Sequence, residues 1–431
     1  MHIKDLYSLF LDSAGISTDS RKIMSGQIFF ALKGEHFNGN QFAHKALELG
    51  ASYAVIDESL NNKDQRLIHV SDVLNTLQEL AHYHRKQLNC QVLAITGSNG
   101  KTTTKELTAS ILARKYSVYY TSGNLNNHIG VPVTLLEIKD AEIAIIEMGA
   151  NHPGEIARLC QIADPDLGII TNIGKAHLEG FGSLEGVAKS KTELYDYLER
   201  KNGTVFINGT NDLLTSRLSG RDLRIVSYFI GQNLMCDGYA YDNSNFLRLE
   251  LVFSTGKSWT VNTRLSGKYN LENVLAASGI GNFFQVPEEE IVSAIEHYNP
   301  GNNRSQYFDS GKNKLILDAY NANPTSMAEA LKNFKDLKAE NKMLILGDMA
   351  ELGDFSGEEH QNVLENLVSY GFKKVYLSGK EFFRYRNKYP YSFFEDTPGL
   401  YEHLSANPVI DHFILLKSSR TGKLEILTEI L

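Results

Sequence analysis

Short apolar runs separated by turn-forming residues dominate the first part of the chain. IFFAL at 28–32 and YAVI at 53–56 are bounded by Gly, Asn and Asp, a pattern typical of strands joined by turns. The N-terminal residues MHIKDLYSLFLDSAG predict a short amphipathic helix, and residues 72–88 predict a longer one. Residues 1–84 are therefore expected to form a small N-terminal α/β domain.

From Gln91 onward, apolar runs alternate with helical patterns, which is typical of buried parallel strands connected by helices. These runs are VLAITG at 92–97, IAIIEMG at 143–149 and DLGIIT at 166–171. Between 204 and 266 polar and apolar residues alternate instead, as in FLRLELVF, so we expect antiparallel hairpins on the same sheet or at its edge. Residues 85–300, which end in two predicted helices, are expected to form a central domain with a mostly parallel sheet.

The segment NPGNN at 299–303 is the best candidate for a linker, because Pro, Gly and Asn end a helical pattern there. Beyond it, four apolar runs alternate with helical segments: KLILDAY, KMLILGDM, KVYLSG and HFILLK. This alternation predicts a Rossmann-like domain over 301–431. The fold class is thus α/β with three domains, which agrees with a length of 431 residues at roughly 150 residues per domain.

ITGSNGKTTTKEL at 95–107 lies between a predicted strand and a helix predicted over 101–115. Gly97 and Gly100 permit a tight turn in which backbone N–H groups approach phosphate, and the helix that follows presents its positive end. Lys101 would reach the β- and γ-phosphates, and the Thr102 hydroxyl would bind Mg²⁺. The loop is shorter than GxxxxGK[ST], since Ile95 stands where that pattern has its first Gly. The segment predicts an ATP-binding site in a P-loop-type domain, and the alternative is a Gly-rich turn with a chance Lys-Thr pair.

Two further polar residues follow predicted strands of the same sheet. Glu147 ends IAIIEMG, where a carboxylate could complete Mg²⁺ coordination, or could simply be the first polar residue after a buried strand. His177 lies on a Gly-rich loop after DLGIIT and is one of 13 histidines, most of which are expected to be ordinary surface or core residues.

Composition excludes several classes of protein. Apolar residues make up 42% and charged residues 22%, which is close to the globular average. A net charge of -8 argues against a nucleic-acid-binding protein and against binding to anionic lipid. The three cysteines, Cys90, Cys160 and Cys236, have no CxxC spacing, so neither a disulfide framework nor a structural zinc site is expected. No apolar run approaches the roughly 20 residues of a membrane span, so no membrane insertion is expected and a cytoplasmic protein is predicted.

Motifs over nearly the whole chain resemble the Mur ligase family. They are STDSRKIMSGQIFFALKGEHFNG at 17–39, GSNGKTTTKE at 97–106, GNLNNHIGVPVTLL at 123–136, EMGANHPGEI at 147–156, TNIGKAHLEGFGSLEGVAKSKTEL at 171–194, SGKYNLENVLAA at 266–277, LDAYNANPTSM at 317–327 and LGDMAELGDFSGEEH at 346–360. The phosphate loop is shared by all Mur ligases and by folylpolyglutamate synthetases, so it cannot distinguish between them. DAYNANP and GDMAELG resemble the member that adds D-Ala-D-Ala.

The resemblance implies an ATP-dependent amide-bond-forming ligase with a UDP-sugar domain, a central ATPase and a closing C-terminal domain. Its substrates would be ATP, UDP-N-acetylmuramoyl-tripeptide and D-Ala-D-Ala, and it would use two Mg²⁺ ions. The chain is expected to be a monomer. The γ-phosphate would pass to the tripeptide carboxylate, and the dipeptide amine would attack the resulting acyl phosphate. Two alternatives remain: another Mur ligase that adds a single amino acid, and a non-catalytic nucleotide-binding relative.

The resemblance also implies roles for individual residues. Lys101, His177 and Lys191 would be catalytic, with Thr102 and Glu147 at the first Mg²⁺ and His177 at the second, where a carbamylated Lys191 supplies a carboxylate. Lys189 is the rival of Lys191, because VAKSK offers two lysines. The implied ATP-binding residues are Gly97, Ser98, Asn99, Gly100, Lys101, Thr102, Thr103, Asn270, Asn273, Arg304, Asp318, Tyr320 and Asn321.

The implied UDP-sugar and muramoyl contacts are Asp19, Ser20, Arg21, Lys33, Gly34, Asn126 and Asn127. The chain departs from the family pattern at three places. Tyr269 replaces the usual His, Asn38-Gly39-Asn40 replaces Asp-Gly-His, and Lys417-Ser418-Ser419-Arg420 replaces KGSR. The last two departures bear on the uridine and dipeptide contacts.

Overall fold

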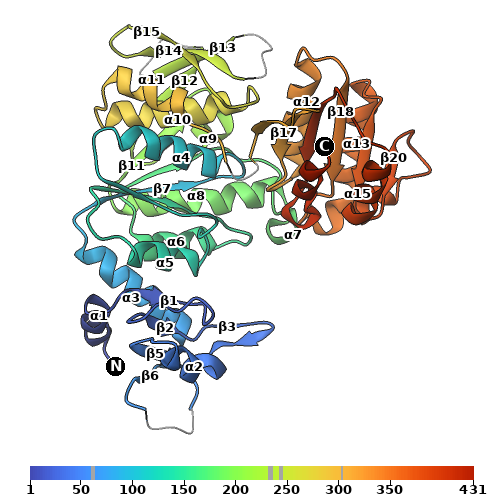
Figure 1. Ribbon diagram of the computed structural model, residues 1–431. Helices are drawn as coiled ribbons and strands as arrows, with labels where there is room; N and C mark the ends of the chain where they lie inside the picture. Colours follow the sequence, from blue (N-terminus) through green and yellow to red (C-terminus); the bar gives the residue numbers. More distant parts are fainter. Residues whose placement is uncertain (60–63, 232–235, 242–245, 302–303) are drawn as a thin grey trace.

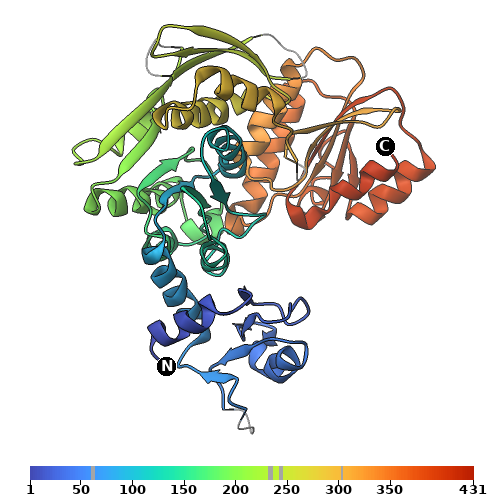
Figure 2. The same cartoon turned by 60° about the vertical axis from the view of Figure 1, so that its left-hand side comes forward.

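The computed structural model describes residues 1–431 except 60–63, 232–235, 242–245 and 302–303. Its elements form three α/β domains, with the central domain between the N-terminal domain and the C-terminal domain (Figures 1 and 2). The predicted fold class is therefore confirmed. Over the described residues, we find no helix with the length and apolar character needed to span a bilayer.

The N-terminal domain has a parallel sheet of four strands in the order β1-β2-β5-β6, and a small antiparallel hairpin. The apolar runs IFFAL and YAVI supply the paired strands β2 and β5. The elements are α1 (Ile3–Leu11), β1 (Ile16–Ser17), β2 (Ile28–Phe30), β3 (Lys33–Gly34), β4 (Phe37–Asn38), η1 (Gly39–Phe42), α2 (Ala43–Glu48), β5 (Tyr53–Ile56), β6 (Leu67–His69) and α3 (Val73–Gln87).

Helix α3 joins the first two domains. It begins at Val73 after the N-cap residue Asp72, whose side chain accepts a hydrogen bond from Asn75 N, and three basic residues lie in its last turn. Leu77 and Leu80 are fully buried in a core that also contains residues of α5 and α6. The expected domain boundary between residues 84 and 85 falls inside this continuous helix.

The central domain has a nine-stranded sheet in the order β15-β14-β13-β12-β11-β10-β7-β9-β8. Helices α4, α10 and α11 cover one face, and α5, α6 and α8 cover the other (Figure 1). The elements are β7 (Gln91–Thr96), α4 (Lys101–Leu112), β8 (Val118–Tyr120), α5 (Gly130–Leu136), β9 (Ile143–Glu147), α6 (Glu155–Ala163), β10 (Leu167–Ile170), α7 (Leu178–Phe181), α8 (Leu184–Arg200), β11 (Thr204–Asn208), α9 (Asp212–Ser216), β12 (Arg224–Ile230), β13 (Cys236–Tyr241), β14 (Arg248–Phe253), β15 (Ser258–Asn262), α10 (Asn270–Phe283) and α11 (Glu288–His297).

The expectation of antiparallel hairpins over the whole of 204–266 is wrong for its first part. Strand β11 is buried along its whole length and pairs in parallel with both β10 and β12. Helix α9 lies between β11 and β12, as a parallel connection requires. Among the described residues of 204–266, only the pairs β13–β14 and β14–β15 are antiparallel.

The C-terminal domain has a six-stranded sheet in the order β16-β17-β21-β18-β19-β20, parallel except for the edge strand β16. Helices α12 and α13 pack on one face, and α15 and η4 on the other. The predicted linker at 299–303 ends in two residues outside the described part of the chain. The elements are β16 (Gln306–Asp309), β17 (Lys314–Asp318), α12 (Pro324–Asp336), β18 (Lys342–Gly347), η2 (Gly353–Phe355), α13 (Ser356–Ser369), β19 (Val375–Ser378), α14 (Lys380–Phe383), β20 (Ser392–Phe394), α15 (Thr397–Ala406), β21 (Phe413–Lys417), η3 (Arg420–Gly422) and η4 (Leu424–Glu429).

Candidate active site

A cavity of about 920 Å³ lies between the central and C-terminal domains. Its walls come from the loops that follow β7, β9 and β10 and from residues at the ends of β17 and β21, which is where parallel α/β sheets usually bind ligands. All the nucleotide- and metal-binding residues implied by the sequence line this cavity, except Gly97 and Lys191. Asn126 and Asn127 line it as well.

Two glycines allow the phosphate loop between β7 and α4. Gly97 has φ 145° and Gly100 has φ 78°, both in the region that favours glycine. A Cβ atom on Gly97 would overlap Thr171 Oγ1, and one on Gly100 would overlap Asn273 Oδ1. The loop therefore requires glycine at both positions. It leads into the N-terminal end of α4, and the positive end of the helix dipole there favours binding of an anion such as phosphate.

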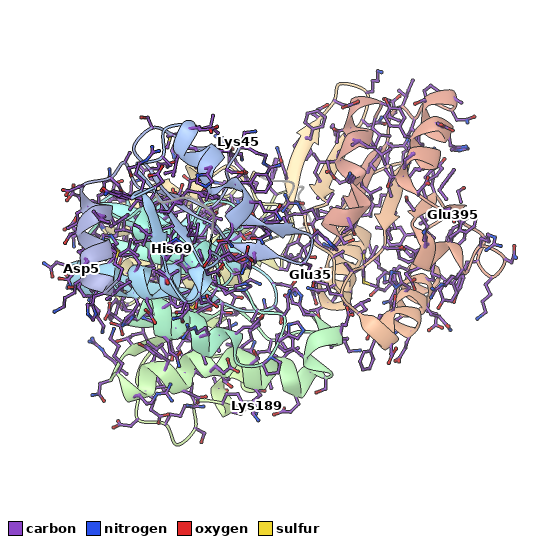
Figure 3. The ribbon with its side chains drawn as sticks, turned by 90° about the horizontal axis from the view of Figure 1, so that it is seen from below. Asp5, Glu35, Lys45, His69, Lys189 and Glu395 are labelled. Atoms are coloured by element: carbon purple, nitrogen blue, oxygen red, sulfur yellow. The ribbon has the colours of Figure 1, made fainter. Side chains whose placement is uncertain are left out.

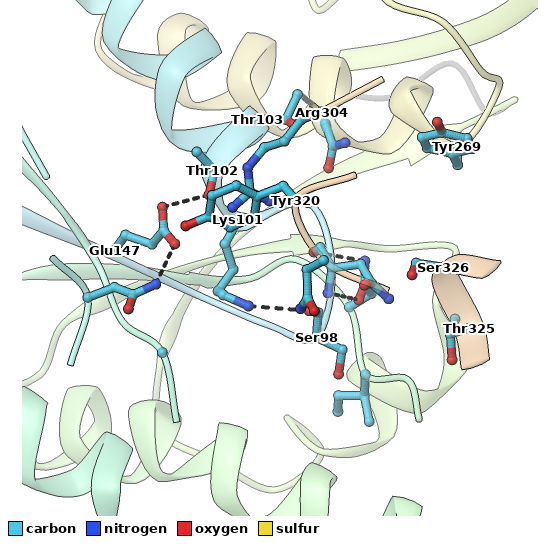
Figure 4. A pocket seen from close by; sticks show the side chains of 18 of the residues that line it. Ser98, Lys101, Thr102, Thr103, Glu147, Tyr269, Arg304, Tyr320, Thr325 and Ser326 are labelled. Atoms are coloured by element: carbon cyan, nitrogen blue, oxygen red, sulfur yellow. Dashed lines mark hydrogen bonds between the residues drawn. The ribbon is translucent and has the colours of Figure 1, made fainter. Parts of the chain in front are cut away.

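Hydrogen bonds from the loop after β10 hold this segment in place. Ser98 N donates to Asn172 O at 3.0 Å, and Asn99 N donates to Asn172 Oδ1 at 2.9 Å. Lys101 Nζ donates to Gly97 O at 2.7 Å and to Ser98 O at 3.2 Å, so its ammonium group lies against the loop; Figure 4 shows the bond to Ser98. Burial lowers the pKa of Lys101, and an anionic group bound in the loop would favour the charged form again.

Thr102 and Glu147 meet beside the phosphate loop. Thr102 Oγ1 donates to Glu147 Oε2 at 3.0 Å, and Asn126 Nδ2 donates to Glu147 Oε1 at 2.8 Å (Figure 4). Glu147 is 1% exposed, and Lys105 Nζ lies 3.6 Å from Oε2. A hydroxyl and a buried carboxylate fit the oxygen ligands that Mg²⁺ prefers, with phosphate oxygens and water as the others. Within the described ranges we find no group of three or more His, Cys, Asp or Glu side chains placed to hold a metal ion.

His177 is in contact with the C-terminal domain. It precedes α7 with φ 51°, and its Nδ1 lies 2.5 Å from Glu351 Oε2. The backbones also meet, since Glu179 N donates to Glu351 O at 3.2 Å. The contact with His177 lowers the pKa of Glu351. Glu351 is not among the site residues expected from the sequence, in which its place in GDMAELG is the one feature that points to it.

The two candidate lysines of α8 have different surroundings. Lys191 is 1% exposed, and its Nζ donates a hydrogen bond to Ala150 O at 3.4 Å. Burial, and secondarily the charge of Lys101, lowers the pKa of Lys191 to about 7. Lys189 is exposed and projects from the outer edge of the molecule (Figure 3). Of the two lysines, Lys191 is the one with a buried amine, and its lowered pKa favours the neutral form that reacts with CO₂.

The opposite end of the cavity combines α10 with the start of the C-terminal domain. Asn273 Nδ2 donates to Asn270 Oδ1 at 2.9 Å, and both residues are buried. The Tyr269 hydroxyl lies 2.6 Å from Ser305 Oγ. The Arg304 guanidinium lies 3.7 Å from the centre of the Tyr320 ring, and its buried Nε has no hydrogen-bond partner among the described residues. An Arg with a spare donor suits a phosphate oxygen.

Three contacts of the C-terminal domain at this site were not predicted from the sequence. Lys417 Nζ lies 2.5 Å from Asp318 Oδ2, at the ends of two paired strands. Asn323 caps α12 and also donates to Asn99 Oδ1 of the phosphate loop at 2.8 Å. Lys175 Nζ lies 2.6 Å from the buried Glu359 carboxylate. In the sequence, Lys417 could have been noticed from its segment KSSR. No sequence feature singled out Asn323 within DAYNANP, and none singled out Lys175.

The residues implied for UDP-sugar binding lie apart from this cavity, on the N-terminal domain. Arg21 and Asp19 form an ion pair at 2.9 Å, and the Arg21 side chain is 85% exposed. Lys33 at the β3–β4 hairpin pairs with Asp57 at 2.9 Å and with Glu58 at 3.0 Å. None of Asp19, Ser20, Arg21, Lys33 and Gly34 lines the cavity. A single substrate that contacts both places has to extend from one domain to the other.

Three family models match successive parts of the chain. The model described as "Mur ligase family, catalytic domain" matches residues 13–92, "Mur ligase middle domain" matches 95–281, and "Mur ligase, glutamate ligase domain" matches 303–403.

Curated relatives and solved structures resemble the chain over most of its length. The UDP-N-acetylmuramoyl-tripeptide–D-alanyl-D-alanine ligase of Bacillus subtilis (strain 168) is 34% identical, over 95% of this chain and 91% of its own. The enzyme of that name from Escherichia coli (strain K12) is 36% identical, over 85% and 81%.

Two solved structures cover both chains almost fully. The structure of MurF from Acinetobacter baumannii has a TM-score of 0.86 and 29% identity, over 98% of this chain and 97% of its own. That of the MurF ligase from Thermotoga maritima in complex with ADP has a TM-score of 0.85 and 26% identity, over 97% of each chain.

Proposed function

Because the chain belongs to the Mur ligase family, we propose that it joins D-alanyl-D-alanine to the tripeptide of UDP-N-acetylmuramoyl-tripeptide in peptidoglycan precursor synthesis. The reaction uses ATP and releases ADP and phosphate. The observation that carries this function is the phosphate loop, with Lys101, Thr102 and Glu147 around it, at one wall of a cavity completed by the C-terminal domain.

The chemistry explains why a nucleotide site and a peptide site have to meet. A carboxylate is a poor acyl donor at neutral pH, and phosphorylation turns one of its oxygens into a leaving group. The dipeptide amine attacks the acyl phosphate, a tetrahedral intermediate forms, and phosphate leaves as the amide bond is made. Negative charge gathers on the transferred phosphoryl group, so fixed cations at that point accelerate the transfer.

The residues around the loop fit these demands. Lys101 lies at the first position of α4, and its ammonium group would bind the γ-phosphate oxygens. Thr102 and Glu147 would hold Mg²⁺, which when bound neutralises phosphate charge. We propose that His177 and a carbamylated Lys191 bind a second ion. Arg304, Asn270 and Asn273 would bind the nucleotide from the other end of the cavity.

Contacts between the domains support a closed arrangement during catalysis. Asn323 meets the phosphate loop at Asn99, and Glu351 meets His177, so residues of the C-terminal domain touch both the ATP loop and the proposed metal ligand. Closure of this kind excludes water, which would otherwise hydrolyse an acyl phosphate.

The remaining proposals concern the domains and the location. We assign UDP-sugar binding to residues 1–84, ATP binding to 85–300 and completion of the ligase site to 301–431. The proposed use of ATP and the free, buried cysteines Cys90 and Cys160 support a cytoplasmic location.

The proposed reaction predicts a defined amine specificity for the wild-type protein. In the presence of ATP, Mg²⁺ and a UDP-muramoyl tripeptide, phosphate release is expected with D-Ala-D-Ala and not with L-Lys or meso-diaminopimelate. A UDP-muramoyl dipeptide with these two amino acids is the matched control, since it is the acceptor for a ligase that adds a single amino acid. Coupling only in that control would contradict the proposal, and no coupling in any combination would favour a non-catalytic relative.

Glu351→Gln is expected to lower kcat by about 10- to 100-fold and to raise the Mg²⁺ concentration that gives half-maximal activity. A carboxylate beside a metal-binding histidine orients its ring, and loss of such a partner typically has an effect of this size. The measurement is a Mg²⁺ titration of ADP formation. Glu358→Gln, at an exposed position of α13, is the matched control and should behave as wild type. An unchanged Mg²⁺ dependence for Glu351→Gln would contradict the role given to this residue.

A further inference from the structure

We propose that Arg158 binds a carboxylate of the peptide substrate other than the one that ATP activates, and so helps to select the peptide. This inference rests on the proposed function and adds a specificity-determining residue to it. Arg158 has no role in the mechanism above and is not part of the motifs that carry the family resemblance.

Arg158 lies on the path between the two ends of the substrate. It belongs to α6 and lines the active-site cavity together with Asn126, Asn127 and His128. Its hydrogen-bond partners Asn75 and Gln78 lie on α3, the helix that joins the N-terminal and central domains. A substrate held by the N-terminal domain that reaches Lys101 would therefore pass this residue.

The guanidinium group is fixed in place by neutral acceptors. Arg158 Nε and Nη2 donate to Gln78 Oε1 at 3.0 and 2.7 Å, and Nη2 also donates to Asn75 Oδ1 at 3.1 Å. Gln78 is itself anchored, because it is 6% exposed and its Nε2 donates to His128 O at 2.8 Å. These bonds orient the cation without neutralising it.

No acidic side chain within the described ranges lies close enough to pair with Arg158. The carboxylate of Glu155, one turn earlier on α6, accepts hydrogen bonds from Asn151 N at 2.6 Å and His152 N at 3.1 Å instead. Lys417, by contrast, is neutralised by Asp318 in the same cavity. An oriented and unpaired guanidinium with Nη1 free of any hydrogen bond within the described structure is suited to a planar carboxylate.

The proposed substrate can supply such a group. A solved relative from Acinetobacter baumannii is named for a UDP-N-acetylmuramoylalanyl-D-glutamyl-2,6-diaminopimelate substrate. A peptide of this kind carries a free carboxylate on its glutamyl residue and a second carboxylate on diaminopimelate, besides the one that is coupled. The Arg158 guanidinium could bind either of these two spare carboxylates. Substrates that lack one or the other show which of them it binds.

The test compares Arg158→Gln with wild type on three UDP-muramoyl tripeptides. One has both spare carboxylates, one has the glutamyl carboxylate as a carboxamide, and one has lysine in place of diaminopimelate. We expect wild type to prefer the first over at least one of the others. In Arg158→Gln, KM for the first should rise about 10- to 100-fold, KM for ATP should stay within about twofold, and that preference should disappear. If wild type disfavours one of the two altered tripeptides and Arg158→Gln does not, the carboxylate missing from that tripeptide is the one that Arg158 binds.

Lys139→Gln removes a cation from an exposed position and is the matched control, expected to keep the wild-type preferences. Equal losses of Arg158→Gln on all three tripeptides, with a lower Tm, would mean that Arg158 only ties α6 to α3, and would overturn the inference. A wild-type protein without any preference would overturn it as well. Failure of the proposed function is a separate result, because it abolishes coupling for every tripeptide, and calorimetric binding of the three tripeptides then tests Arg158 directly.

Discussion

Lys101→Ala is expected to abolish ATP-dependent coupling, with kcat lowered at least about 100-fold, the size of effect seen when one transition-state donor is removed. Lys101 begins α4, and its Nζ already lies against the phosphate loop through Gly97 O. Without it, the charge that develops on the transferred phosphoryl group loses its fixed cation. ADP formation in the presence of UDP-muramoyl tripeptide and D-Ala-D-Ala is the measurement.

Two comparisons make this result specific. Lys101→Met keeps most of the side-chain volume and removes only the charge, so it should fail as completely as Lys101→Ala. Lys139→Ala, at an exposed position away from the loop, should retain wild-type turnover and Tm. Normal turnover in a folded Lys101→Ala protein would remove the phosphate loop from the mechanism, and with it the proposed function.

Lys191→Ala is expected to lose nearly all activity, and a small carboxylic acid such as acetate is expected to restore part of it. The pKa of about 7 leaves a large share of the Lys191 amine neutral near pH 7.5, and only a neutral amine reacts with CO₂ to give a carbamate. Because the neutral fraction rises with pH through about 7, carbamate formation at constant dissolved CO₂ should rise over the same range. Isotope-labelled bicarbonate allows the carbamate to be observed directly by NMR.

Lys189→Ala is the matched control for this prediction, since it removes a lysine from the same helix at an exposed position. It should keep its activity and should not respond to acetate. A carboxylic acid that rescues Lys189→Ala and not Lys191→Ala would transfer the role to Lys189. Because Lys191 is buried, Tm is measured in parallel, and rescue by acetate distinguishes a missing carboxylate from a damaged fold.

Local patterns were sufficient to predict most of the sheets, and one part of the central domain shows where they fail. The strands β7, β9 and β10 are almost continuously apolar because parallel strands are covered on both faces. The alternation over 204–266 predicts antiparallel hairpins, whereas β11 and β12 pair in parallel. A strand's partners depend on how its crossover packs against the sheet, and the strand itself carries no record of this.

The sequence by itself determined the phosphate loop. Gly97, Gly100, Lys101 and Thr102 are close along the chain, and the backbone conformation that they require restricts which residues can occupy those positions. Only the tertiary structure decided that Lys191 rather than Lys189 is buried, that His177 meets Glu351, that Asn99 meets Asn323, and that Arg158 is oriented by α3. Each of these depends on segments far apart in the chain, and burial and contact arise only when the domains pack together.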